Sequence, residues 1–182
     1  MAVFVALLRG INVGGHRKVP MADLRETVEA AGFGAPATYV QSGNLVMKAA
    51  RGDGRAVEKT LAKAIADRFG FEVPVVARDL EQWQRIVREN PFEDAVQKPA
   101  TLHAFILSRP AAREAEGKLA ERERADEDYR LAGDVLYLST PSGLGRSKFA
   151  ASVERLLGVP ATARNWNTML KLEAMATDLD AD

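Results

Sequence analysis

The sequence contains no cysteine among its 182 residues, so disulfide bonds, thiolate metal sites and a thiol nucleophile are excluded. It also has no excess of charge, because 25 Lys and Arg residues balance 25 Asp and Glu residues. This balance lacks the global field typical of nucleic-acid or membrane-surface proteins. No apolar run approaches the roughly 20 residues that span a bilayer. The longest, residues 2–8, lacks a preceding basic flank, so we expect neither a signal peptide nor a membrane contact, and we predict a cytoplasmic location.

The composition is that of an ordinary folded protein. Hydrophobic residues make up 47% of the chain, which is enough for one domain or two small ones with a substantial core. The acidic run 121–128 is typical of a solvated helix face, and the acidic tail of a frayed terminus.

The first half of the chain alternates strand and helix patterns. The continuous apolar run 3–8 is too short for a helix and predicts a strand buried on both faces. Ser42-Gly43-Asn44 separates two β-prone runs and indicates a hairpin. In order, the patterns predict a strand at 3–8, a helix at 20–31, strands at 38–41 and 45–48, a helix at 57–69 and an edge strand at 73–77 containing Pro74.

This order, β-α-β-β-α-β, is that of the ferredoxin-like fold. Asp79 and Gln82 form a capping-box pattern that begins an extra helix, and residues 91–100 resemble a linker. The same order recurs as strands at 101–107, 128–131, 135–139 and 159–163, and helices at 110–124, at 147–157 and around Trp166.

We therefore predict an α+β protein of two ferredoxin-like halves, each with antiparallel strands and an extra helix, although the halves show no obvious residue identity. The expected boundaries are 1–90 for the first half, 91–100 for the linker and 101–182 for the second half. The competing prediction is one continuous sheet of all eight strands.

The topology brings two glycine-rich segments of the first half to the same end of its sheet. These are the loop 9–18 and the hairpin 42–44. Backbone N–H groups, a helix start and cations together favour an oxyanion ligand. The candidate binding residues are Arg9, Asn12, Gly14, Gly15, Arg17, Lys18, Ser42 and Asn44. The structural alternative is that the glycines only form tight turns and the cations are solvated, since neither a Walker loop nor a dinucleotide fingerprint is present.

A second cluster is predicted at one end of the other half, where the loop 139–148 lies beside the segment 164–168. Its candidate binding residues are Gly143, Gly145, Arg146, Ser147, Lys148, Arg164, Asn165, Trp166 and Asn167. Trp166 would stack on a base or ring. Alternatively, an Asn caps the helix and Trp166 belongs to the core.

Other chemistries have little support. His16 and His103 lack a second ligand at metal spacing, so we expect no metal site, and no motif indicates a cofactor. A Ser42–His16–acid triad is disfavoured because there is no nucleophile elbow.

Several motifs together resemble a bacterial family catalogued only as a domain of unknown function, number 1697. They extend over nearly the whole chain and are residues 7–15, 39–44, 90–92, 141–148 and 162–168. The resemblance implies two ferredoxin-like subdomains and no established activity, cofactor or catalytic residue. His16-Arg17-Lys18 departs from the Asn-Lys type of segment expected there.

Three functions remain open. The favoured one is binding of a phosphate-bearing small molecule or nucleic-acid segment by the loops 9–18 and 42–44. One alternative is a metal-independent hydrolase of a phosphate ester or acyl phosphate, by fold analogy with acylphosphatase, in which Arg9 or Arg17 clamps the phosphate and Asn44 orients water. The other is a structural or protein-interaction module that uses exposed edge strands. The oligomeric state is not predicted.

Overall fold

The computed structural model describes residues 1–50 and 52–182. The chain divides into two compact units, Met1–Arg85 with Lys171–Asp182 and Ile86–Leu170. The division into 1–90, a linker at 91–100 and 101–182 stays a prediction. Each unit is described by itself.

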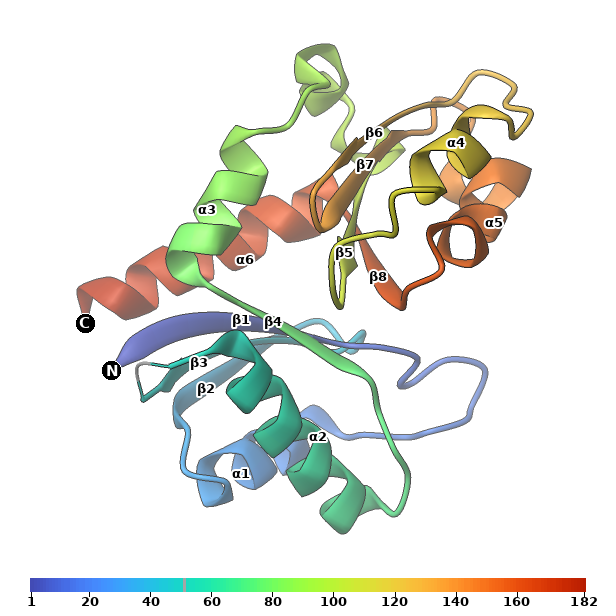
Figure 1. Cartoon of the computed structure of the whole chain (residues 1–182). Helices are drawn as coiled ribbons and strands as arrows, with labels where there is room; N and C mark the ends of the chain where they lie inside the picture. The colour runs from blue at the N-terminus through green and yellow to red at the C-terminus, as the bar shows by residue number, and fades with distance from the viewer. Residues whose placement is uncertain (51) are drawn as a thin grey trace. The chain divides into compact units, whose positions relative to one another are not determined.

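The first unit contains a four-stranded antiparallel sheet with the order β2-β3-β1-β4 (Figure 1). Its central strands are β1 and β3, as the ferredoxin-like topology predicts. Its elements are β1 (Ala2–Leu8), α1 (Met21–Ala30), β2 (Gly34–Tyr39), β3 (Asn44–Ala49), α2 (Gly54–Phe69), β4 (Val75–Asp79) and the start of α3 (Leu80–Arg88).

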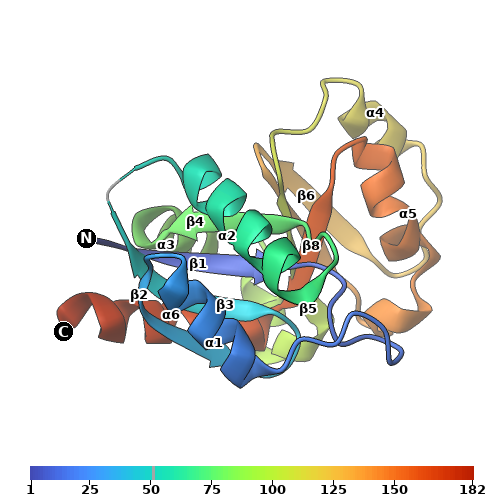
Figure 2. The ribbon, with the colours of Figure 1, turned by 90° about the horizontal axis from the view of Figure 1, so that it is seen from below.

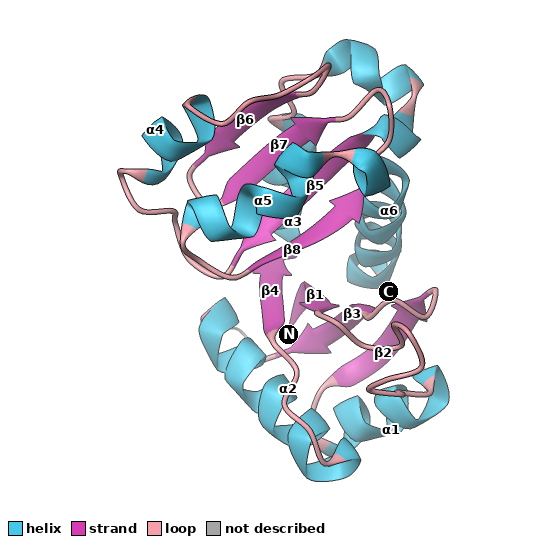
Figure 3. Ribbon diagram, turned by 90° about the vertical axis from the view of Figure 1, so that its right-hand side faces the viewer, coloured by secondary structure: helices cyan, strands magenta, loops and turns pink. Residues whose placement is uncertain are grey.

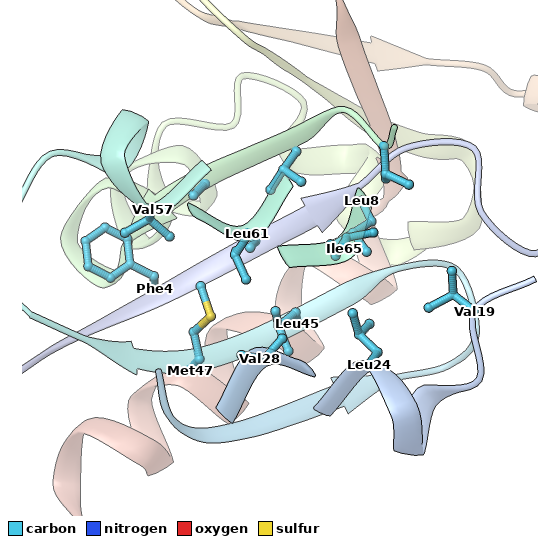
Figure 4. Packing of buried hydrophobic residues seen from close by; sticks show 14 of the residues in the cluster. Phe4, Leu8, Val19, Leu24, Val28, Leu45, Met47, Val57, Leu61 and Ile65 are labelled. Carbon is cyan, nitrogen blue, oxygen red and sulfur yellow. The ribbon is translucent and has the colours of Figure 1, made fainter. Parts of the chain in front are cut away.

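The helices α1 and α2 cover one face of this sheet (Figure 4). Residues alternate along β1, so Phe4, Ala6 and Leu8 face the two helices, while Val5 and Leu7 on the opposite face are also fully buried. Burial on both faces explains why the strand reads as an unbroken apolar run.

The second unit repeats the topology with the strand order β6-β7-β5-β8 (Figure 3). Its elements are β5 (Leu102–Leu107), α4 (Ala115–Ala120), β6 (Asp128–Ala132), β7 (Val135–Ser139), α5 (Lys148–Leu157), β8 (Ala161–Asn165) and the start of α6 (Trp166–Ala181). Short 3₁₀ turns occur at Glu93–Gln97, Pro99–Thr101 and Leu144–Arg146. The strands form two separate four-stranded sheets, so the alternative of one continuous sheet is wrong.

The charged helix predicted at 110–124 is much shorter than expected, because α4 spans only Ala115–Ala120. Ala115 and Leu119 bury against the sheet, but no apolar residue follows Leu119 at helical spacing until the strand β6. A helix without a buried face gains too little from propensity alone to continue. Residues 121–127 therefore form a loop, which matters for the site described below.

Matching the two topologies reveals a residue repeat that the sequence alone does not make obvious. Residues 73–78 and 159–164 share the pattern Val-Pro-x-x-Ala-Arg, and each leads into the fourth strand of its sheet. The Arg78 guanidinium donates to the Ala77 carbonyl, and the Arg164 guanidinium donates to the Ala163 carbonyl, both at 2.8 Å. The next residue caps a helix in both units, since Asp79 accepts from the Gln82 N–H and Asn165 from the Thr168 N–H.

The capping box at Asp79 is complete, because the Gln82 side chain in turn accepts from the Asp79 N–H at 3.1 Å.

In the described part of the chain, no helix is both long enough and apolar enough to cross a membrane.

Candidate functional site

The two glycine-rich segments of the first unit lie side by side, beyond the end of β1 (Figure 2). The Leu8 N–H donates to the Gly43 carbonyl at 2.7 Å, and the Asn12 side-chain amide donates to the Gln41 carbonyl at 2.9 Å. We call residues 9–19 and 40–44 together the loop cluster. The chain geometry on which the sequence prediction depends is therefore present.

Asn12 holds the loop cluster together. Its Nδ2 donates to the carbonyls of Val19 and Gln41, both at 2.9 Å, and its Oδ1 accepts from the Val19 N–H at 2.8 Å. An amide nitrogen has two hydrogens, and both are used here. Asn12 therefore positions the loop rather than offering donors to a ligand.

Gly14 and Gly15 form the tip of a small hairpin. Their φ angles are 59° and 77°, and the His16 N–H closes the turn on the Val13 carbonyl at 3.1 Å. Positive φ at both central residues defines a type I′ turn, which explains the Gly-Gly pair. The N–H groups of Gly14 and Gly15 donate no hydrogen bond within the described chain, so both remain available to an acceptor.

Gly43 and Asn44 are buried at the start of β3, against the end of β1. A Cβ atom on Gly43 would lie 2.7 Å from the Leu8 Cβ and 3.2 Å from the Ile11 Cδ1, so only glycine fits. Asn44 is fully buried, and its Nδ2 donates to the Tyr39 carbonyl and to the Ser42 Oγ. Both donor hydrogens of Asn44 are thus used within the protein, as they are in Asn12.

Backbone strain is concentrated in the loop cluster. Four non-glycine residues in the described chain have positive φ, and three of them lie here: Asn12 at 55°, Arg17 at 48° and Val40 at 49°. Asn tolerates this conformation, but a β-branched valine does so at an energetic penalty. Val40 and Val13 are also highly exposed, at 54% and 68%. Strained and exposed residues of this kind are typical of binding loops.

The charged side chains of the loop cluster are all basic. His16, Arg17 and Lys18 are exposed, and Arg9 is half-buried with its N–H bonded to the Pro74 carbonyl at 3.0 Å. Ser42 is exposed at the rim. Free amide hydrogens and exposed cations on a rigid hairpin make a surface that suits an anion.

The predicted second cluster separates into two parts with different roles. Ser147 caps α5, accepting from the Ala150 N–H at 2.8 Å, and Gly143 has a φ of 93° at the preceding turn, which contains Gly145. Arg146 and Lys148 are exposed and line a pocket of about 360 Å³.

Segment 164–167 does not contribute to that pocket. Burial lowers the pKa of Arg164 to about 10, and Asn165 is an N-cap. Trp166 is 1% exposed, and its ring centroid lies 6.3 Å from that of Tyr137. A buried indole presents no face to a base, so the core alternative for Trp166 is correct and the stacking hypothesis is wrong. Asn167 is exposed on α6.

The sequence prediction missed the other side of this pocket. Arg122 and Arg124 come from the run interpreted as a solvated helix face. The available signal was that no apolar residue follows Leu119 at helical spacing, which indicates that the helix ends and that these arginines belong to a loop.

The comparisons with known proteins agree with the architecture. Residues 1–137 match the family described as "Protein of unknown function (DUF1697)". The chain belongs to this family. The resemblance inferred from the motifs is thereby confirmed.

The chain is also similar to a solved structure, that of the conserved bacterial protein SP0830 from Streptococcus pneumoniae. The two are 22% identical, with a TM-score of 0.75 over 97% of this chain and 99% of that one. At this identity the likeness supports the fold alone. No curated protein matches the sequence.

Proposed function

We propose that the loop cluster binds a phosphate-bearing ligand, either a nucleotide or a segment of nucleic acid. The observation that carries the proposal is a hairpin fixed by Asn12, with unbonded N–H groups at Gly14 and Gly15 beside the exposed Arg17 and Lys18. Such N–H groups and cations are the donors that phosphate oxygens accept from most strongly.

The rigidity of the hairpin supports the same proposal. A loop that is already ordered loses little conformational entropy when it binds, so more of the interaction energy appears as affinity. The strained φ angles at Arg17 and Val40 also indicate a conformation that the surrounding contacts impose. The Arg17 guanidinium lies beside Gly10 of the same loop, since its Nη1 is 3.7 Å from where a Cβ on Gly10 would be.

The hydrolase alternative is less well supported. It requires the Asn44 amide to orient a water molecule, yet both of its hydrogens are engaged by Tyr39 and Ser42 in a fully buried position. Arg9 and Arg17 remain candidate phosphate ligands under either function, so the binding proposal keeps the cations and drops the water-orienting role.

Edge-strand pairing is also less well supported. β2 and β6 are edge strands, as the topology predicts. β2 carries Pro36 and an irregular register between Gly34 and Ala37, while β6 exposes Asp128 and Arg130. Proline, bulges and charge all disfavour pairing with another strand.

The test is a fluorescence-anisotropy titration of labelled single-stranded oligonucleotides and nucleotides at several salt concentrations. We expect the affinity to fall with salt, because cation–phosphate contacts release counterions. For oligonucleotides, the double variant Arg17→Ala, Lys18→Ala should bind more weakly, and its log–log salt slope should be smaller by about 0.7 for each phosphate-binding cation removed.

Lys59→Ala is the matched control, since Lys59 is an exposed cation on α2, away from the loops. If the double variant and Lys59→Ala bind both ligand types as the unmodified chain does, the loop cluster is not the binding site.

A further inference from the structure

We infer that the second unit contains a separate site for a small phosphomonoester, in the pocket between residues 122–127 and 146–149. This site is independent of the loop cluster. It is assembled from the loop that the sequence pattern indicated as a solvated helix face and from the segment that begins α5.

The pocket gathers four cations without ion-pair partners. Arg122, Arg124, Arg146 and Lys148 line a volume of about 360 Å³, and none of them forms an ion pair within the part of the chain that is described. Like charges held close together repel one another unless an anion lies between them. A bound anion would therefore be stabilised by all four.

Two acidic residues of the same run, Asp126 and Glu127, form hydrogen bonds that hold the loop in place. Asp126 accepts from the Ser142 hydroxyl at 2.7 Å, and Glu127 accepts from the Ala125 N–H at 2.8 Å. A hydrogen bond from Ser147 lowers the pKa of Glu127, so this carboxylate stays ionised while it ties the loop to the start of α5. These contacts connect the loop to the segment around the start of α5. The arginines line the space between the loop and that segment.

Arg124 is oriented before any ligand arrives. Its guanidinium lies 4.9 Å from the Tyr129 ring centroid and 5.7 Å from that of Phe149, and its Nη1 donates to the Leu119 carbonyl at 3.4 Å. Stacking of this kind fixes the plane of the group and leaves its other donors free. A planar fork of N–H groups binds two phosphate oxygens at once.

Charge and size together indicate the ligand class. The four cations and the two lining carboxylates, Glu123 and Glu127, leave two positive charges uncompensated, which matches the dianion of a phosphomonoester. A pocket of about 360 Å³ is at the small end of ligand sites, which favours a sugar phosphate or mononucleotide over a larger molecule.

Isothermal titration calorimetry with inorganic phosphate and ribose 5-phosphate tests the inference, with chloride at matched ionic strength as the reference. We expect saturable binding that weakens below about pH 6, where the phosphate becomes a monoanion. The variant Arg122→Ala, Arg146→Ala should bind at least about tenfold more weakly, because two donors of charge-assisted hydrogen bonds are removed. Arg155→Ala, an exposed arginine near the other end of α5, should bind as the unmodified chain does.

Two outcomes would overturn the inference. One is binding no stronger than the chloride reference, and the other is unchanged binding by the double variant. Circular dichroism checks that the variant is folded, and Lys148→Gln provides a second, single substitution that should also weaken binding. Binding of ribose 5-phosphate that persists in Arg17→Ala, Lys18→Ala and is weakened in Arg122→Ala, Arg146→Ala belongs to this pocket, so failure here and failure of the loop-cluster proposal can be distinguished.

Discussion

His103 is a buried histidine in the central strand β5 of the second unit. It is 7% exposed, and its Nδ1 has no hydrogen-bond partner among the described residues. Burial lowers the pKa of His103 below its ordinary value of 6.5, outweighing a hydrogen bond with the Thr101 backbone that acts in the opposite direction. The folded protein therefore resists protonation of this ring more than the unfolded chain does.

The lowered pKa of His103 makes the free energy of unfolding depend on pH. Below pH 6.5 the unfolded state takes up the proton first, so the free energy of unfolding falls as the pH drops toward the lowered pKa of the folded state. We expect His103→Leu to remove this part of the acid sensitivity, measured as urea unfolding between pH 7.5 and about 5. His16→Gln, at an exposed position, is the control. An unchanged pH profile in His103→Leu would contradict the prediction.

At the scale of elements, the β2–β3 hairpin depends on one glycine. Gly43 has a φ of 80°, and a Cβ there would meet the Leu8 Cβ at 2.7 Å and the Leu8 carbonyl oxygen at 2.9 Å. A left-handed alanine is unfavourable by about 1–2 kcal/mol, and overpacking adds about 1–3 kcal/mol.

We therefore expect Gly43→Ala to lower the free energy of unfolding by about 2–5 kcal/mol in a urea titration. Gly145→Ala is the comparison, because no atom lies within 4 Å of its added Cβ and its φ is not positive. Its effect should stay within about 0.5 kcal/mol. Equal effects of the two substitutions would show that close packing under the hairpin is not what requires glycine.

The edge strand β4 shows how an element can be protected by a side chain. Glu58 of α2 accepts from the Ala77 N–H at 2.9 Å, and burial raises the pKa of this carboxyl. An edge N–H that is already bonded is less able to pair with another chain. The carbonyl of Pro74, just before this strand, accepts a hydrogen bond from the Arg9 N–H. In the other unit the carbonyl of Pro160 accepts from the Ser108 N–H in the same way.

At the scale of the whole molecule, the C-terminal segment belongs to the first unit. Lys171–Asp182 groups with Met1–Arg85, and within it Leu172 and Ala176 are fully buried. Burying one leucine side chain contributes about 1.5–3 kcal/mol.

Removing residues 171–182 should therefore destabilise the first unit by at least about 2 kcal/mol. Hydrogen exchange should accelerate in β1 and β3 more than in β5 and β7. A chain shortened only by the last two residues, which are exposed, should behave as the full chain does. Uniform exchange rates in the longer truncation would contradict this assignment and would favour the sequence-based assignment of residues 101–182 to the second half.

The fold was largely accessible from the sequence because its signals are local. The apolar run at 3–8, the Asp79–Gln82 capping box and the Ser42-Gly43-Asn44 turn each indicate one element through residues close together in the chain. The helix predicted at 110–124 was too long, because beyond Leu119 the chain has no apolar face that could pack against the sheet. The Val-Pro-x-x-Ala-Arg repeat became visible only when topology aligned the two halves.

The candidate sites were accessible only in part. Topology correctly placed the loop 9–18 beside the hairpin 42–44, because strand direction fixes which loops share an end of a sheet. It did not show that Asn12 and Asn44 use their amide hydrogens within the protein. Hydrogen-bond partners depend on distances between residues far apart in the chain, which spacing does not encode.

The sequence by itself determined the order of elements, the two-fold repetition of the topology and the absence of thiol chemistry, since these follow from periodicity, turn residues and composition. Only the tertiary structure decided that Trp166 is core and that Arg122 and Arg124 line the same pocket as Arg146 and Lys148. The physical reason is that burial and charge proximity are properties of packing between segments. A sequence pattern shows which residues are available, and the folded chain selects which of them meet.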